Sequence, residues 1–153
     1  MALIDFFDRG WRSNPQGAAY IQDDREYSFT EVGELSCRIA NALLAQGLAK
    51  ETKGAVWALN DVTAWTCTLG LWRANMCWIP VGARNSADEN HYVLDAFDCE
   101  VLFFQKYFAG VIAELQSRLP KIKYWICVDG DAPEVTGAVS LDAWTNDQPS
   151  TSP

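Results

Sequence analysis

Histidine is nearly absent from this sequence, and the five cysteines form no Cys-x-x-Cys pair. With His91 as the single histidine, neither a histidine-rich metal site nor a Ser-His-Asp triad that uses any other histidine can form. Every cysteine lies in an apolar or amphipathic segment, a setting typical of small buried side chains. We therefore expect structural thiols at positions 37, 67, 77, 99 and 127.

The short motifs that hold phosphates or activate nucleophiles are missing too. No two glycines are separated by a single residue, which excludes GxGxxG, and no Gly-Lys-Ser or Gly-Lys-Thr is present for a P-loop. GxSxG and HExxH do not occur either. These 153 residues therefore contain no motif for a nucleotide-phosphate loop, for the nucleophile of an α/β-hydrolase or for the zinc site of a metalloprotease.

Basic residues are outnumbered by acidic ones, 12 to 20, which gives a formal charge of -8. Because this excess repels phosphate backbones and anionic lipid, nucleic acid is not an expected partner. No apolar run approaches the roughly 20 residues of a membrane-spanning helix. The N-terminus has acidic residues within its apolar stretch and no basic region before it, unlike a signal peptide. We expect a cytoplasmic protein without a membrane span.

What the sequence does contain is a regular alternation of amphipathic and wholly apolar segments. The predicted helices lie near residues 3–11, 30–46, 61–75, 86–97 and 111–119, the strands near 55–59, 77–81, 101–104 and 124–128, and a hairpin near 18–22 and 26–29. Continuously apolar strands are typical of parallel sheets covered on both faces. The pattern predicts an α/β fold, namely an open, doubly wound, mostly parallel sheet with helices on both faces and a small N-terminal hairpin.

Helix boundaries follow from capping residues. We expect Thr30 and Asp61 to cap the helices that they precede, and Ser86 with Glu89 to form a capping box. Asn75 stands where a left-handed residue would close a helix, a conformation that Asn tolerates better than most residues.

The helix that begins at Asp61 has one apolar face, which is formed by Val62, Trp65, Leu69 and Trp72. Two tryptophans on one face predict that this face is deeply buried.

Polar residues after predicted strands are candidate ligand contacts. Arg84 follows the strand at 77–81, at the edge where open α/β sheets bind ligands, and its guanidinium could meet a phosphate or a carboxylate. His91 could titrate near neutral pH. For both residues a surface or structural role is the competing interpretation. Asp129 and Asp131 could bind a metal ion, but Asp-Gly-Asp is first of all a turn sequence.

The run from Ala58 to Val81, together with Tyr27–Val32 upstream and Glu89–Leu94 downstream, resembles the opening segment of the adenylate-forming enzymes. This superfamily comprises acyl-CoA synthetases, luciferases and the adenylation domains of peptide synthetases. The framework residues that carry the resemblance are Thr30, Asn60, Gly70, Arg73, Ala74 and Pro80.

The resemblance extends from about Phe6 to Trp144, and the stretch from Trp78 to Leu94 is most similar to the acyl-CoA ligase branch. Gly82 departs from that branch, since many members have Asn there. The enzymes of this family activate a carboxylic acid with ATP and Mg²⁺ to an acyl-adenylate, and then pass the acyl group to a thiol, commonly that of coenzyme A.

Their signature is a Ser/Thr/Gly-rich phosphate loop ending in Pro-Lys-Gly, followed by adenine and ribose motifs and a catalytic lysine in a mobile C-terminal domain. By this resemblance every one of those elements would lie beyond Pro153. No catalytic residue can therefore be transferred to this chain.

The resemblance implies that residues 1–147 form the N-terminal subdomain of an ATP-dependent acyl-CoA synthetase, followed by a disordered tail at 148–153. The parent enzyme would use ATP, Mg²⁺ and coenzyme A, whereas this segment would hold no cofactor and would be inactive alone. Its partner would be the remainder of the parent ligase. In isolation the uncovered sheet would favour a homodimer or a swapped assembly. The competing class is a stand-alone, flavodoxin-like binding or interaction module.

Overall fold

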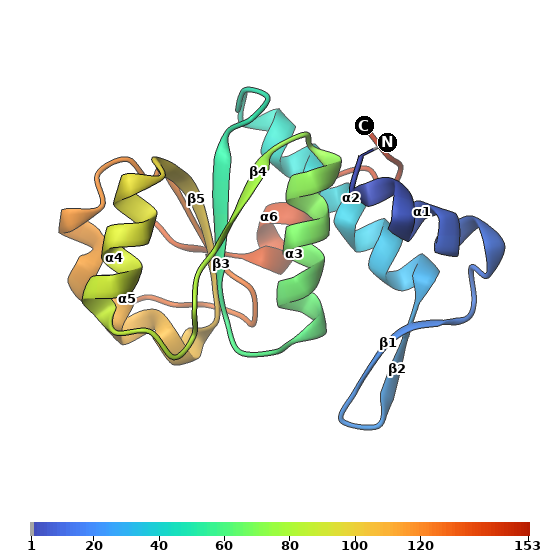
Figure 1. Ribbon diagram of the computed structural model, residues 1–153, viewed down its shortest axis with the longest axis horizontal. Coiled ribbons are helices and arrows are strands. Elements are labelled where there is room, and N and C mark those ends of the chain that lie inside the picture. Colours follow the sequence, from blue (N-terminus) through green and yellow to red (C-terminus); the bar gives the residue numbers. More distant parts are fainter. Residues whose placement is uncertain (1) are drawn as a thin grey trace.

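Residues 2–153 are described by the computed structural model, which begins with helix α1 (Ile4–Ser13) and a hairpin of β1 (Ala18–Gln22) and β2 (Arg25–Ser28). A series of alternating strands and helices follows (Figure 1). Its helices are α2 (Phe29–Ala45), α3 (Val62–Arg73), α4 (Ala87–Ala96), α5 (Ala109–Leu115) and α6 (Leu141–Thr145). Its strands are β3 (Lys53–Trp57), β4 (Cys77–Pro80), β5 (Cys99–Phe104), β6 (Tyr124–Cys127) and β7 (Val139–Ser140). Two 3₁₀ turns, η1 (Lys106–Phe108) and η2 (Gln116–Arg118), flank α5.

The strands of this series form one parallel, 5-stranded sheet in the order β4-β3-β5-β6-β7. The chain adds β4 on one side of β3 and then adds β5, β6 and β7 on the other side, so the strand order reverses at β3. β1 and β2 form a separate antiparallel pair. The predicted open, doubly wound α/β fold with a small hairpin is confirmed.

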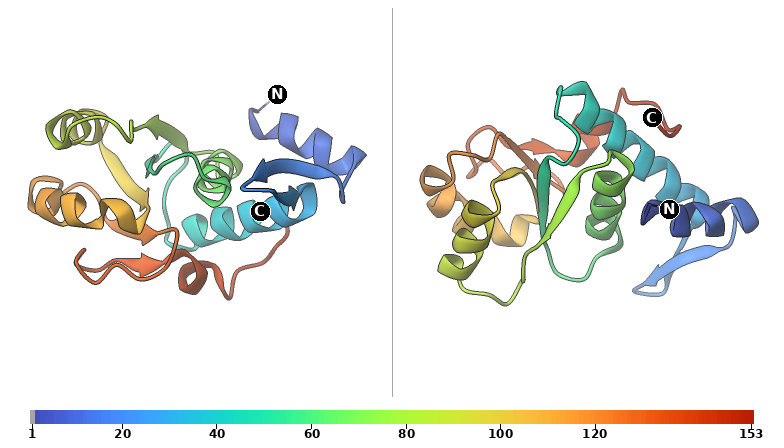
Figure 2. Two further views of the ribbon diagram at one scale, coloured as in Figure 1. Left: turned by 90° about the horizontal axis from the view of Figure 1, so that it is seen from below. Right: turned by 45° about the horizontal axis from the view of Figure 1, so that its top comes forward.

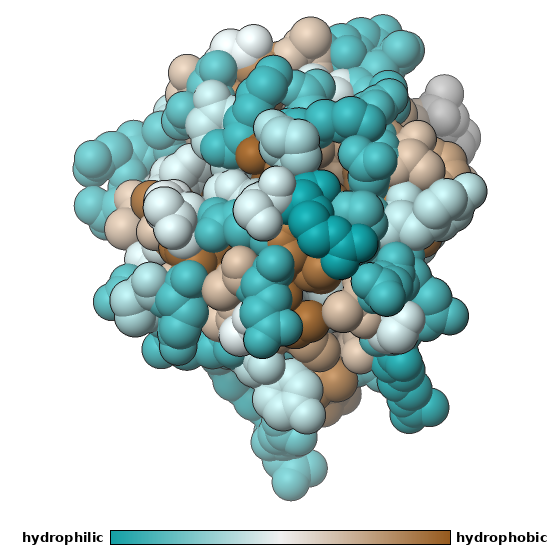
Figure 3. Space-filling model, turned by 90° about the vertical axis from the view of Figure 1, so that its left-hand side faces the viewer, coloured by the Kyte–Doolittle hydropathy of each residue, from teal (hydrophilic) through white to brown (hydrophobic). Residues whose placement is uncertain are grey.

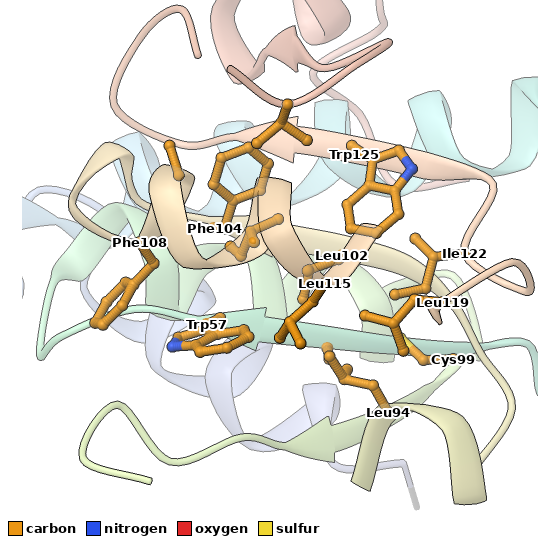
Figure 4. Packing of buried hydrophobic residues seen from close by; sticks show 14 of the residues in the cluster. Trp57, Leu94, Cys99, Leu102, Phe104, Phe108, Leu115, Leu119, Ile122 and Trp125 are labelled. Atoms are coloured by element: carbon orange, nitrogen blue, oxygen red, sulfur yellow. The ribbon is translucent and has the colours of Figure 1, made fainter. Parts of the chain in front are cut away.

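Helices cover both faces of the sheet, as the left view of Figure 2 shows. α4 and α5 pack on one face, where Leu102 and Phe104 of β5 are fully buried. α2, α3 and α6 pack on the other face, where Val101 and Phe103 are fully buried. Because successive side chains of a strand point to opposite faces, a strand that is covered on both faces must be apolar throughout. Figure 4 shows the first of these two clusters around Trp57.

α2 and α3 approach each other closely because Gly70 of α3 has no side chain. A Cβ atom at this position would lie 2.4 Å from Ile39 Cγ2 of α2, well inside van der Waals contact. This framework glycine therefore has a packing role, which any larger residue would disrupt.

The prediction that the tryptophans of α3 are deeply buried is wrong. Trp65 is 37% exposed, and Trp72 is only partly buried. Both meet Trp78 of β4 edge to face, with ring centroids 6.2 and 6.1 Å from it. The residues that α3 buries against the sheet are smaller, among them Ala64 and Cys67. Small side chains let the helix lie close to the sheet, so the indoles are left at its rim.

The predicted cap of α2 is also wrong. The capping residue is Ser28, whose Oγ accepts a hydrogen bond from the Glu31 N–H at 3.1 Å. Thr30 lies inside the helix, where its hydroxyl donates to Pro15 O at 2.9 Å and accepts from the Trp11 Nε1–H at 3.2 Å. Thr30 therefore ties α2 to α1 and to the loop that follows α1, a contact between segments that local sequence does not reveal.

The other three predicted capping sites are confirmed. Asp61 caps α3 by accepting a hydrogen bond from the Ala64 N–H at 2.8 Å. Ser86 and Glu89 form the capping box of α4. Asn75, just past α3, has the left-handed φ of 57°.

Two C-terminal elements, β7 and α6, are not predicted by the sequence pattern. β7 pairs with β6 over only two residues, too few to carry any periodicity, and α6 has only five residues. β3 begins at Lys53, two residues earlier than the predicted strand at 55–59.

A buried ion pair joins α1, α2 and α3. The Arg73 guanidinium donates to both carboxylate oxygens of Asp8, at 2.6 and 3.1 Å, and its Nε donates to Ser36 Oγ at 3.1 Å. The Trp11 ring lies 5.9 Å from the guanidinium carbon. We call these four residues, Asp8, Trp11, Ser36 and Arg73, the helix corner. A bidentate pair of this kind fixes geometry as well as charge.

Residues 148–153 pass beside α2. Asn41 Nδ2 donates to Pro149 O and Thr151 O, at 3.0 and 2.9 Å, and Arg73 Nη1 donates to Ser152 Oγ at 3.4 Å. α1 and residues 148–153 consequently lie on the same side of the molecule (Figure 1). The disorder of this tail and the boundary at residue 147 stay predictions, which amide hydrogen exchange would test.

The side of the molecule formed by α4 and α5 is mostly hydrophilic, with a narrow hydrophobic strip (Figure 3). No helix within residues 2–153 combines the length and the apolar character needed to cross a membrane.

Candidate functional site

Two loops lie side by side at the carboxyl edge of the sheet. Residues 58–61 link β3 to α3, and residues 81–86 link β4 to α4, both at the lower edge in Figure 1. Parallel strands bring all their carboxyl ends to one edge, which is where open α/β sheets bind ligands. We call these two loops, with the start of α3, the carboxyl edge.

Three adjoining hollows at the carboxyl edge share Asn60 in their walls. The first, of about 350 Å³, lies between the hairpin and α3. The second, of about 240 Å³, lies between α3 and the end of β4. The third, of about 440 Å³, lies between the two loops and includes Arg84. Asn60 is exposed, and its side-chain amide has no hydrogen-bond partner among residues 2–153. One acceptor and two donor hydrogens therefore remain available to a ligand.

The hairpin is fastened to the start of α3. Gln22 Oε1 accepts from the Val62 N–H at 2.8 Å, and Gln22 Nε2 donates to Asp61 Oδ2 at 3.3 Å. The Trp65 Nε1–H donates to the Tyr20 hydroxyl at 2.9 Å. These bonds fix the two walls of the first hollow. The first of them also occupies the Val62 N–H at the start of α3, which would otherwise be available to an anion.

The loop at 81–86 is held from below by Asn90 of α4. Asn90 is fully buried, donates from Nδ2 to Gly82 O at 2.9 Å, and accepts from Asn85 Nδ2 at 3.0 Å. A Cβ atom on Gly82 would lie 2.6 Å from Asn85 Oδ1. The glycine that departs from the family pattern therefore leaves room for this side-chain network, which positions the backbone on either side of Arg84.

The two candidate ligand residues lie in different settings. Arg84 is exposed and lines the third hollow. His91 lines none of the three hollows, and its Nε2 lies 3.0 Å from Arg118 O at the end of η2. A ligand in the third hollow would thus have Arg84 as its cationic neighbour. Ligand contact by either residue stays a prediction.

Asp129 has the turn role favoured by its sequence. Its Oδ1 accepts from the Lys106 N–H at 2.8 Å and from Cys127 Sγ at 3.3 Å. Among residues 2–153 no three His, Cys, Asp or Glu side chains gather where they could hold a metal ion.

The crevice between β3 and β5, where the strand order reverses, is closed at its carboxyl end. Gln105 follows β5 and accepts from the Leu59 N–H through its Oε1 at 2.8 Å. The Gln105 N–H donates to Trp57 O at 3.2 Å. A ligand is expected at such a reversal, yet a side chain of the protein bridges it, and the hollows lie on the β4 side instead.

Four of the five cysteines are buried, in agreement with structural thiols, but Cys77 on β4 is exposed, so that prediction is wrong for Cys77. Burial raises the pKa of the Cys127 thiol to about 11 and that of Cys99 to about 12. It also raises the pKa of Cys37 and of Cys67. These four thiols are therefore protonated at neutral pH and are poor nucleophiles.

Sequence reasoning missed the side-chain amides of Gln22, Asn90 and Gln105. Gln22 and Gln105 form hydrogen bonds with residues distant in the sequence, and no local pattern predicts such a contact. Asn90 had a usable signal, because it lies four residues before the fully buried Leu94 on the same helix face. An Asn in line with a core leucine is a candidate for a buried, hydrogen-bonded amide.

Comparison with known proteins gives one consistent result. A family model described as "AMP-binding enzyme" matches residues 7–153. The 4-hydroxybenzoate–CoA/benzoate–CoA ligase of Rhodopseudomonas palustris is 29% identical over 136 residues, which are 88% of this chain and 25% of that protein. Tyrocidine synthase 3 of Brevibacillus parabrevis is 23% identical over 130 residues, which are 85% of this chain and 2% of that protein.

A crystal structure of the anthranilate CoA ligase AuaEII in complex with anthranoyl-AMP shares the fold, with a TM-score of 0.90 and 21% identity. The alignment covers 99% of this chain and 29% of that one. The chain thus spans between a quarter and three tenths of the CoA ligases that it matches here.

Proposed function

The chain belongs to the AMP-binding enzyme family, and on that premise we propose that it forms the N-terminal part of an acid–thiol ligase. The complete enzyme would join a carboxylic acid to ATP, releasing pyrophosphate and forming an acyl-adenylate. It would then transfer the acyl group to coenzyme A with release of AMP. The observation that carries this proposal is the family match over residues 7–153, which is supported by similarity to CoA ligases.

ATP and Mg²⁺ do not fit a site built from residues 2–153 alone. No acidic cluster suited to a metal ion is found among them, and the sequence has no glycine-rich phosphate loop. The nucleotide and the metal would be held by other parts of the ligase. We therefore expect the isolated chain to be inactive, and we derive no catalytic step from its residues.

This chain would contribute one wall of the enzyme's binding site. Asn60 and Arg84 both face solvent at the carboxyl edge, and the guanidinium offers a fixed positive charge to a phosphate or carboxylate. The free thiols among the described residues suit a reducing compartment, which supports placing the ligase in the cytoplasm.

The reading frame after codon 153 tests the assignment. We expect a Ser/Thr/Gly-rich loop ending in Pro-Lys-Gly, and a native stop codon there would contradict the proposal. In that case the hollows at the carboxyl edge would favour a stand-alone binding module. Carboxylate-dependent pyrophosphate release by the isolated chain would contradict the expected inactivity.

We also propose that the isolated chain self-associates through β4. Within residues 2–153 this strand is at the edge of the sheet and pairs only with β3, so one side of its backbone has no strand partner there. Cys77 is exposed on it. Cys77→Lys should give a monomer in light scattering at micromolar concentration, because a charge on an edge strand blocks pairing, whereas Cys77→Ser should keep the dimer. A monomeric unmodified chain would contradict the proposal.

A further inference from the structure

Residues 148–153, which we call the tail, bend around one side-chain amide of α2. The Asn41 Nδ2 atom donates to Pro149 O at 3.0 Å and to Thr151 O at 2.9 Å. The same nitrogen lies 3.0 Å from Cys37 O, a carbonyl of its own helix that already accepts the Asn41 backbone N–H. Because an amide nitrogen carries two hydrogens, Asn41 has one for each of the two tail carbonyls.

A second contact ties the tail to the helix corner. Arg73 Nη1 donates to Ser152 Oγ at 3.4 Å, and the Arg73 side chain is itself buried and held by Asp8. Ser150, which lies between the two carbonyls that Asn41 binds, is half-buried, whereas residues 151–153 are exposed. The tail is therefore held by polar contacts, mainly through its backbone.

The sequence of the tail suits such a contact. Residues 148–153 include no charged side chain, so the net charge of -8 does not repel them. The two prolines, at 149 and 153, restrict φ and reduce the conformational freedom that docking removes. Just before the tail, Thr145 is buried at the end of α6 and donates from its hydroxyl to Leu141 O at 2.8 Å. The tail thus starts from a fixed point, which raises its effective concentration at Asn41.

Asn41 itself lies in the interior of α2, between Ala40 and Ala42. Asn forms helices less readily than Ala, because its side chain competes for backbone hydrogen bonds. We propose that α2 carries a docking site for the tail, in which Asn41 binds the carbonyls of Pro149 and Thr151 and fixes the path of the chain beside the helix corner. These contacts outweigh the disorder that the composition of the tail favours by itself.

The class of ligand is a neutral, bent segment of backbone, and the occupant is the chain's own tail. The docking does not depend on the ligase assignment, because every residue that it uses belongs to this chain. Within such a ligase it would fix the point, beside α1 and α2, at which the following segment begins.

Order parameters from ¹⁵N relaxation of the 153-residue chain test the proposal. The probes are the amides of Ser150, Thr151 and Ser152, since the prolines have none. We expect order parameters close to the value of about 0.85 for rigid backbone in the unmodified chain, and below about 0.6 in Asn41→Ala. Ala removes both donors and favours the helix, so the amides of α2 should keep their order.

Two further variants complete the experiment. Asn41→Asp is nearly isosteric but replaces the NH₂ group with an acceptor oxygen, so it should also release the tail. Gln46→Glu is the matched control, since it makes the same change from amide to carboxylate at the exposed end of α2, outside these contacts, and it should leave the tail ordered. Proteinase K gives a second readout. It should cleave the tail roughly tenfold faster in both Asn41 variants, the effect of about two lost hydrogen bonds.

The proposal is overturned if the amides at 150–152 have order parameters below about 0.6 in the unmodified chain. It is equally overturned if Asn41→Ala and Asn41→Asp leave the order and the cleavage rate of the tail unchanged, or if Gln46→Glu releases the tail as strongly as they do.

Discussion

Arg73 in the helix corner and Arg84 at the carboxyl edge show how differently two regions of this molecule use polar side chains. The Arg73 side chain is 3% exposed, and each of its three guanidinium nitrogens donates a hydrogen bond to Asp8 or Ser36. Arg84 is exposed and has no hydrogen bond or ion pair among residues 2–153. Polar groups that are hydrogen-bonded within the protein hold elements together, whereas polar groups without such partners at a sheet edge remain available for ligands.

The largest expected effect comes from breaking the helix corner. Arg73→Met should lower the free energy of unfolding by about 3–5 kcal/mol, because it leaves the Asp8 carboxylate partly buried without its counter-ion. Urea denaturation measures this change. Arg84→Met, the matched control at the carboxyl edge, should stay within about 0.5 kcal/mol of the unmodified chain. Equal effects of the two substitutions would contradict the distinction between the regions.

A second test sharpens the result for the corner. Adding Asp8→Leu to Arg73→Met removes both charges and should recover most of the lost stability, since an apolar pair can replace a buried ion pair. If the double variant is as unstable as Arg73→Met alone, packing of the guanidinium rather than the orphaned charge explains the loss.

An intermediate effect is expected where the two regions meet, at the start of α3. Asp61→Ala removes the acceptor for the Ala64 N–H and should cost about 1 kcal/mol in thermal or urea unfolding. Asp61→Asn keeps a side-chain oxygen at the cap and should be close to neutral. A large loss with Asn would mean that the charge of Asp61, and not its capping bond, is what matters.

A smaller effect is expected at the closed crevice between β3 and β5. Gln105→Ala removes the acceptor of the Leu59 N–H and should cost about 0.5–1.5 kcal/mol, at the low end because Leu59 is exposed. The Leu59 amide should exchange its hydrogen faster in this variant. Gln105→Glu retains an acceptor oxygen and should protect that amide. Unchanged exchange in Gln105→Ala would show that the bond does not close the crevice.

The smallest effect concerns acid stability at the capping box of α4. Hydrogen bonds from the Ser86 backbone N–H, and then from its hydroxyl, lower the pKa of Glu89 in the folded state. A lowered pKa means that the stabilisation is present above the unfolded pKa and disappears as the pH falls through the folded one. The melting temperature of the unmodified chain should exceed that of Glu89→Gln near neutral pH and converge on it in acid. A constant difference across this range would contradict the assignment.

Much of the fold could be predicted because its signals are local. Continuous apolar strands between amphipathic helices specified the parallel sheet, and Asp61, Asn75 and the pair Ser86 and Glu89 marked helix ends by chemistry confined to one turn. The prediction that Thr30 caps α2 was wrong because two hydroxyl residues, Ser28 and Thr30, lie within one turn. Tertiary contacts with α1 and the loop after it take up the Thr30 hydroxyl and leave Ser28 to cap the helix.

The candidate site was predictable only in part. The position of Arg84 after a strand placed it at the carboxyl edge, since parallel strands align their ends. The hollows lie on the β4 side of the carboxyl edge for two reasons. Gln105 bridges the crevice between β3 and β5, and Gln22 fastens the hairpin to the start of α3. Both bonds join residues distant in sequence, so no periodicity or motif reports them.

By itself the sequence determined the α/β class, the alternation of helices and strands, and the family, because each rests on patterns within short windows of the chain. Only the tertiary structure decided which polar groups are satisfied. It buried Arg73 and Asn90, left Arg84 and Cys77 exposed, and moved the tryptophans of α3 to the rim. The physical reason is that burial and hydrogen bonding depend on the elements that pack over a residue, and the chain brings those elements together from far along its length.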